Sequence, residues 1–365
     1  MKYLFALAIF MHGLIHLMGF AKAFRFGNMA QLTKDISKPA GSFWLLACGL
    51  FLTCAVGFLL KKDWWPILAM LAVATSTVVI LISWKDARLG MIPNLMILLV
   101  AIAAWTTQRF EASFKQDVMD NLQRTNNLAI DLLIENDIRL LPKPVQKYLH
   151  YAGALNKPKV KNMRVVFEGE MRSRSKGWFK FQSVQYNFFD EPARLFFMKA
   201  NMFGTAIPGY HKYQNASATM DVKPFGLFSV VQAKGVEMNK AETVTVFNDM
   251  CLMAPASLID TRIQWEAIDS LTAKAIFTNG SSKIAATLYF SEAGQLVNFI
   301  SDDRYDISDM KQYRFSTPVK EYKNLDGRNV LQYGLAVWHY PEGEFDYGKF
   351  YLKSIAYNVD DFQTW

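Results

Sequence analysis

Residues 64–84 read WWPILAMLAVATSTVVILISW, a run of 21 residues without a charged side chain. A helix needs about 20 mainly apolar residues to cross the hydrocarbon core of a bilayer, so this run predicts a membrane span. Charged residues flank it, and three further apolar runs of similar length share this pattern: Tyr3–Ala21, Phe43–Leu60 and Met91–Thr107. The sequence therefore predicts a four-helix transmembrane bundle over residues 1–108.

The first apolar run has a second interpretation, because Ala21-Lys22-Ala23 loosely fits the cleavage pattern of a secretory signal peptide. The run is long for a signal peptide and three more spans follow it, which favours an uncleaved span. Lys and Arg are divided five against six between the two ends of the bundle, so the positive-inside rule leaves the orientation open. We expect a multi-pass protein of the cell membrane.

The charges separate the chain into two parts. The first 107 residues hold nine of the 40 Lys and Arg and three of the 32 Asp and Glu, which leaves 31 basic and 29 acidic residues for the remainder. The basic excess therefore belongs to the membrane loops and does not indicate nucleic-acid binding, which clusters Lys and Arg on one face of a folded domain.

The hydrophobic periodicity changes along the rest of the chain. Residues 109–158 are predicted to be a helical linker, because Phe110, Phe114, Val118 and Leu122 recur every four residues. From residue 159 the apolar positions alternate, and turn signals such as Asn-Gly and Asp-Gly separate the runs. The fold class is therefore α+β: residues 159–365 are predicted to form an antiparallel, strongly curved, half-barrel-like β-sheet with a few helices.

Two imidazoles in the first span are candidate functional groups. His12 and His16 are four residues apart, so they project from one face of a helix, and ionisable groups within a span are functional candidates. They can hold a metal, a haem or a quinone, with Asp86 as a possible carboxylate partner. The structural alternative is that both imidazoles bond to neighbouring helices and Asp86 pairs with Lys85 or Arg88 at the membrane surface.

The soluble part carries a dense set of aromatic residues in successive predicted strands. Adjacent strand residues point to opposite faces, so some of these side chains lie on each face of the sheet. A sheet that is apolar on both faces is either covered twice, by a helix and a second sheet layer, or it lines a cavity for a lipid or isoprenoid. The residues predicted to line such a cavity are Trp178, Phe181, Tyr186, Phe188 and Phe196.

Several short motifs resemble those of a bacterial family of unknown function, DUF6544/DUF6920. They are His12-Gly13-Leu14-Ile15-His16, Trp84–Gly90, Leu141–Leu149 (LPKPVQKYL) and Trp265–Asp269. The resemblance implies the architecture of four spans and a soluble domain but no activity, substrate or cofactor. The strand-rich layout of the soluble part is also similar to the half-barrel of LolA/LolB-like lipoprotein carriers.

Two functional hypotheses follow. In the first, a membrane-tethered module binds a lipid or other apolar ligand in the curved sheet. In the second, a membrane redox or proton-coupled subunit uses His12 and His16 for haem, metal or quinone. The sequence contains no GxSxG, HExxH or P-loop motif, which favours a binding protein over an enzyme and leaves the cofactor unidentified.

Overall fold

The computed structural model describes residues 2–27, 29–202 and 204–363. The chain divides into two compact units, which are treated separately below. The first is Met1–Phe110 with Phe225–Leu227, and the second is Glu111–Pro224 with Phe228–Trp365.

The first unit is helical. Its helices are α1 (Lys2–Ile15), α2 (Leu17–Ala23), α3 (Lys38–Leu59), α4 (Trp65–Ile82), α5 (Trp84–Ala87), the 3-10 turn η1 (Arg88–Gly90) and the first part of α6 (Met91–Asn126). In the described part of the chain, four helical stretches are long and apolar enough to cross a membrane: Lys2–Ala23, Lys38–Leu59, Trp65–Ile82 and Trp84–Asn126. The prediction of four long apolar helices is confirmed.

Small side chains allow these helices to pack closely. Ala47 of α3 and Ala69 and Ala72 of α4 are completely buried, and Cys54 of α3 lies in the same core. Side chains this small let the backbones of neighbouring helices approach one another closely.

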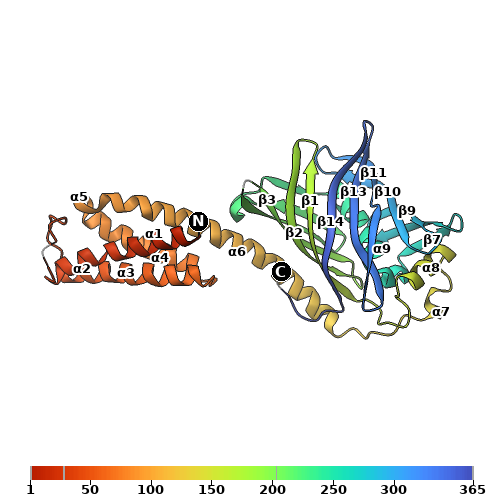
Figure 1. Ribbon diagram of the computed structural model, residues 1–365, viewed down its shortest axis with the longest axis horizontal. Coiled ribbons are helices and arrows are strands. Elements are labelled where there is room, and N and C mark those ends of the chain that lie inside the picture. Colours follow the sequence, from red (N-terminus) through yellow and green to blue (C-terminus); the bar gives the residue numbers. More distant parts are fainter. Residues whose placement is uncertain (1, 28, 203, 364–365) are drawn as a thin grey trace. The chain divides into compact units, whose positions relative to one another are not determined.

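The second unit is a single curved sheet with helices (Figure 1). Its helices are the second part of α6, α7 (Glu135–Ile138), α8 (Lys143–Tyr151), α9 (Val236–Met253) and the 3-10 turn η3 (Pro255–Ile259); the turn η2 (Pro224–Gly226) precedes β6. Its strands are β1 (Asn162–Ser173), β2 (Lys176–Phe188), β3 (Ala193–Met202), β4 (Thr205–Gln214), β5 (Ser217–Val222), β6 (Val231–Lys234), β7 (Ile263–Ala267), β8 (Thr272–Asn279), β9 (Ser282–Phe290), β10 (Leu296–Asp306), β11 (Lys311–Ser316), β12 (Val319–Leu325), β13 (Arg328–Tyr340) and β14 (Gly343–Tyr357).

The strands of the described chain are joined in the order β6-β5-β4-β3-β2-β1-β14-β13-β11-β10-β9-β8-β7, with β12 paired to β13. Each strand pair is antiparallel, and the register shifts in β1·β14 at Val166/Phe167 and in β13·β14 at Ala336/Val337. Such irregularities bend a strand and increase its twist, which lets so wide a sheet curl. The predicted antiparallel half-barrel is confirmed.

The burial of the strands identifies what covers each face of the sheet. β9 alternates between buried and more exposed residues, as expected for a sheet packed on one face only. The last half of β2 and the first half of β3 are buried at every position, so both faces are covered there. On the inner face the cover is α9, which contacts β4, β5, β9 and β10.

The cover on the outer face is the second part of α6. Phe114 is buried there against Phe197 of β3, with ring centroids 5.3 Å apart. Asp117 accepts hydrogen bonds from Tyr210 at 2.8 Å and from Lys212 at 2.6 Å. A helix, rather than the second sheet layer considered from the sequence, thus covers this apolar outer face.

Candidate functional site

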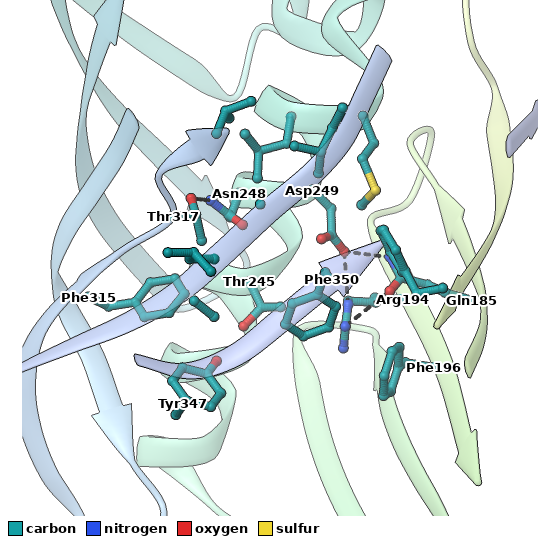
Figure 2. Close-up of a pocket in the computed structure, with 18 of the residues that line it drawn as sticks. Gln185, Arg194, Phe196, Thr245, Asn248, Asp249, Phe315, Thr317, Tyr347 and Phe350 are labelled. Atoms are coloured by element: carbon teal, nitrogen blue, oxygen red, sulfur yellow. Dashed lines mark hydrogen bonds and ion pairs between the residues drawn. The ribbon is translucent and has the colours of Figure 1, made fainter. Parts of the chain in front are cut away.

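A cavity of about 120 Å³ lies between α9 and the inner face of the sheet (Figure 2). α9 makes most of its contacts with β9 and β10 and with β5 and β6, which lie toward the two edges of the sheet, and fewer with β13 in its middle. α9 and β13 supply the largest shares of the cavity wall, and β1, β3 and β14 contribute further residues. The lining is mainly apolar and includes Phe167, Phe196, Leu252, Phe315, Leu331 and Phe350.

A buried charge cluster forms one side of this cavity. Arg194 of β3 donates from Nε to Oδ2 of Asp249 at 2.8 Å, from Nη1 to Oε2 of Glu242 at 3.1 Å, and from Nη2 to Oε1 of Gln185 at 3.1 Å. Gln185 and Asn187 donate to the same Oδ2 at 2.7 and 3.0 Å. Glu242 and Asp249 are seven residues apart, so α9 presents both carboxylates on one face.

The two carboxyl groups differ in proton affinity. Burial raises the pKa of Glu242, but Arg194, His211 and Arg304 outweigh it and bring the pKa down to about 2. Burial also raises the pKa of Asp249, and there Arg194 and Asn187 offset the shift only in part. Glu242 is therefore the stable anion, and Asp249 is the carboxyl group of the cluster that takes up a proton first.

Arg304 of β10 is the second cation that lines the cavity. Its guanidinium carbon lies 4.0 Å from the ring centroid of Phe315 and 4.9 Å from that of Trp338, and Nη1 donates to the hydroxyl of Tyr347 at 2.7 Å. Among the described residues, its buried Nε has no hydrogen-bond partner and no carboxylate lies within ion-pair distance of it. Arg304 thus offers a donor and a positive charge beside an apolar space.

Phe196 is the one residue of the predicted aromatic set that lines the cavity. The guanidinium carbon of Arg194 also lies over the Phe196 ring, 4.7 Å from its centroid. Phe181 is not one of the lining residues, but its ring centroid lies 5.3 Å from that of Phe350, which does line the cavity.

Three other predicted ligand-binding residues lie elsewhere. Tyr186 and Phe188 are buried on the outer face of the sheet. The ring centroids of Tyr186 and Phe114 lie 6.3 Å apart, and the guanidinium carbon of Arg124 lies 5.9 Å from the centroid of the Phe188 ring. Trp178 is 38% exposed near the start of β2. The aromatic cluster seen in the sequence is therefore divided between the two faces.

The predicted histidine pair lies together in the helical unit, with ring centroids 4.9 Å apart. His16 bonds through Nδ1 to the carbonyl of His12 at 2.8 Å and through Nε2 to the hydroxyl of Ser76 at 2.8 Å. His12 bonds through Nε2 to Oδ1 of Asn94 at 2.8 Å. Both ring nitrogens of His16 therefore have hydrogen-bond partners. In this arrangement the two imidazoles cannot both coordinate one metal ion.

The described residues contain no group of three or more His, Cys, Asp and Glu side chains placed to hold a metal. A thiol nucleophile is also unsupported, because Cys251 is completely buried and burial raises the pKa of its thiol.

Asp86 holds a loop of the helical unit. Its carboxylate accepts from the backbone N–H of Thr33 at 2.6 Å, from the Thr33 hydroxyl at 2.8 Å and from the N–H of Lys34 at 3.3 Å. Asp86 lines the same cavity as the two histidines, and among the described residues no hydrogen bond joins its carboxylate to either imidazole ring.

A family model covers residues 132–350 and is described as a family of unknown function, DUF6544. The chain belongs to this family. The resemblance predicted from the LPKPVQKYL motif is thereby confirmed for DUF6544. A search of curated proteins gave no match for this DUF6544 protein.

Solved structures similar to the DUF6544 chain share little sequence with it. A LolA superfamily protein of Nitrosomonas europaea is 10% identical, with a TM-score of 0.34, over 58% of this chain and 92% of that one. A DUF1329 family protein of Desulfovibrio piger is 8% identical, with a TM-score of 0.35, over 60% of this chain and 94% of that one.

Sequence reasoning missed the residues that give the DUF6544 cavity its polar side. Arg194, Glu242, Asp249 and Arg304 lie on three separate elements and come together only through the sheet topology. Two signals were present: an Arg directly before the apolar run Leu195–Met198, and two carboxylates seven residues apart on one face of a predicted helix.

Proposed function

We propose that the half-barrel binds a lipid-like ligand with an apolar tail and one anionic group. The observation that carries the proposal is the Arg304 guanidinium, which lies beside an aromatic cavity and whose buried Nε has no hydrogen-bond partner among the described residues. The tail would contact Phe196, Phe315 and Phe350, and the anionic group would accept from Arg304. A carboxylate or phosphate gains charge-assisted hydrogen bonds from a guanidinium, and an apolar tail gains about 0.8 kcal/mol per buried methylene.

The size of the cavity limits what enters it. An engineered cavity of about 150 Å³ holds a benzene molecule, so the observed 120 Å³ has room for a short stretch of chain. A longer tail needs the wall to move, and the wall includes Met171 and Met253, whose unbranched side chains adapt readily. We infer that binding enlarges the cavity.

The four apolar helices complete the proposal. We infer that they span the cell membrane and keep the half-barrel beside the bilayer, where lipid-like ligands are concentrated.

Isothermal titration calorimetry of the full-length protein in detergent with dodecanoate tests whether Arg304 binds the anionic group. Arg304→Met should weaken dodecanoate binding about tenfold, because it removes a charge-assisted bond. Arg314→Met on neighbouring β11 is the matched control, since that side chain is 56% exposed and pairs with Asp302 outside the cavity. Dodecanol, which lacks the charge, should bind the wild type and Arg304→Met alike.

A second pair of variants tests the apolar half. Thr245 of α9 lines the cavity, and Thr245→Leu should fill part of it and reduce dodecanoate and dodecanol binding together. Thr245→Ser keeps the hydroxyl that donates to the carbonyl of Ala241 and should leave both affinities intact. Unchanged binding in Thr245→Leu and Arg304→Met would refute the proposal.

A further inference from the structure

The helical unit contains a second cavity, of about 290 Å³, which is lined by residues of α2, α5 and the loop of residues 29–37. Its walls include the two buried histidines, Trp44 of α3, and Gly90. The loop is held over it by the bonds from Thr33 and Lys34 to Asp86.

The hydrogen bonds of Asn94 determine which ring nitrogen of His12 carries the proton. Asn94 donates from Nδ2 to Thr77 at 3.1 Å, so its amide oxygen is the atom that faces Nε2 of His12. That nitrogen must then carry the proton, and the neutral ring keeps a lone pair on Nδ1. Within the described residues, no side chain or backbone group donates to this Nδ1.

The walls constrain the ligand further. Trp44 provides an aromatic surface, with its ring 5.4 Å from that of His16. Ile15 and Leu89 also line the cavity and are 54% and 74% exposed, so an apolar tail has a path to the outside of the bundle. The carboxylate of Asp86 already accepts three hydrogen bonds, so the cavity needs no cation to satisfy it.

We propose that this cavity binds a lipid-soluble hydroquinone. One ring hydroxyl donates to Nδ1 of His12, the ring lies against Trp44, and the tail leaves beside Ile15. The donor is the decisive feature: a hydroquinone provides the O–H that Nδ1 lacks, whereas the corresponding quinone has only acceptor oxygens. The proposal concerns binding, and it is independent of the ligand of the half-barrel.

The test uses the full-length protein in phosphatidylcholine nanodiscs under anaerobic conditions, with decylhydroquinone, the corresponding decylquinone and decanol as probes. Decylhydroquinone should bind about tenfold more tightly than decylquinone, the effect of one hydrogen bond to a buried acceptor. Decanol provides a hydroxyl without a ring and should bind weakly. Equal affinities for hydroquinone and quinone, or for hydroquinone and decanol, would overturn the proposal.

Variants locate the site. His12→Gln places its amide where Nε2 lies and can still bond to Asn94, but it lacks an acceptor at Nδ1, so it should remove the preference for the hydroquinone. A Cβ added at Gly90 would lie 2.9 Å from Cδ1 of Ile80 and 3.8 Å from Cε1 of His12, so Gly90→Leu should block the cavity. Gly49→Leu is the matched control, because a Cβ there meets no atom within 4 Å.

Binding that is the same in Gly90→Leu and Gly49→Leu would place the hydroquinone elsewhere and refute the site. A preference for hydroquinone that survives in His12→Gln would refute the role of Nδ1. Because the comparison of probes uses the wild type alone, the proposal stays open to refutation even where a variant fails to fold.

Discussion

Replacing Arg194 by Met tests whether the buried charge cluster is held together as described. The substitution keeps most of the side-chain volume but leaves Glu242 and Asp249 buried without their shared cation. Each of the three side chains is at most 9% exposed, so water cannot compensate for the loss. Removing one partner of a buried ion pair costs about 3 to 5 kcal/mol.

The expected change in melting temperature follows from that cost. For a unit of this size each kcal/mol lowers the midpoint by about 2 to 4 °C, so Arg194→Met should melt about 6 to 20 °C below the wild type. The assay is thermal unfolding of the detergent-solubilised protein at pH 7, followed by the β-sheet signal in circular dichroism.

A triple variant isolates the charge from the volume. Arg194→Met combined with Glu242→Gln and Asp249→Asn has no buried charge at these positions, so it should recover at least half of the lost melting temperature. The single variant should also regain stability as the pH falls from 7 to 5, because its buried carboxyl groups then bind protons. A single variant that melts with the wild type, or a triple variant no better than the single one, would refute the reasoning.

Two further predictions concern the same unit. A fragment beginning at Glu111 should fold as a soluble β-rich domain. A fragment beginning at Asp117 should be less stable, because it lacks Phe114, whose side chain is buried against the sheet and only 1% exposed. Thermal unfolding of both fragments, followed by circular dichroism, checks this. The carboxyl group of Asp249 has a pKa of about 4 in the unfolded chain and a raised pKa in the folded protein, so it binds its proton more tightly in the folded state. As the pH rises from about 4 through the folded pKa, this group therefore lowers the free energy of unfolding. Asp249→Asn should remove this slope, as measured by melts across that range, and an unchanged slope would assign it to another group.

Much of the fold could be predicted from the sequence because its signals are local. Uncharged apolar runs such as residues 64–84 predict long apolar helices, and alternation along β9 predicts a strand packed on one face. The role of residues 111–126 could not be predicted in this way. Their four-residue apolar spacing indicates a helix, but the sheet face that it covers depends on contacts such as Asp117 with Lys212, 95 residues later.

The candidate site could be predicted only in part, for the same physical reason. Period-two alternation places Phe196 and Phe197 on opposite faces, yet it does not say which face encloses a cavity. The charge cluster joins Arg194 to Glu242 and Asp249 across 48 and 55 residues, and no local pattern encodes that pairing. His12 and His16 were accessible to sequence reasoning because a helix fixes the geometry of residues four apart.

Photolabelling would identify the residues that an apolar tail contacts in this protein. The full-length protein in detergent would be irradiated with a fatty acid that carries a diazirine near the end of its tail, and the labelled peptides would be identified by mass spectrometry. We expect labels on β3, β11 and β13, around Phe196, Phe315 and Leu331, and their loss in Thr245→Leu but not in Thr245→Ser. Labels confined to α1–α4, or labels on the half-barrel that persist unchanged in Thr245→Leu, would contradict this expectation.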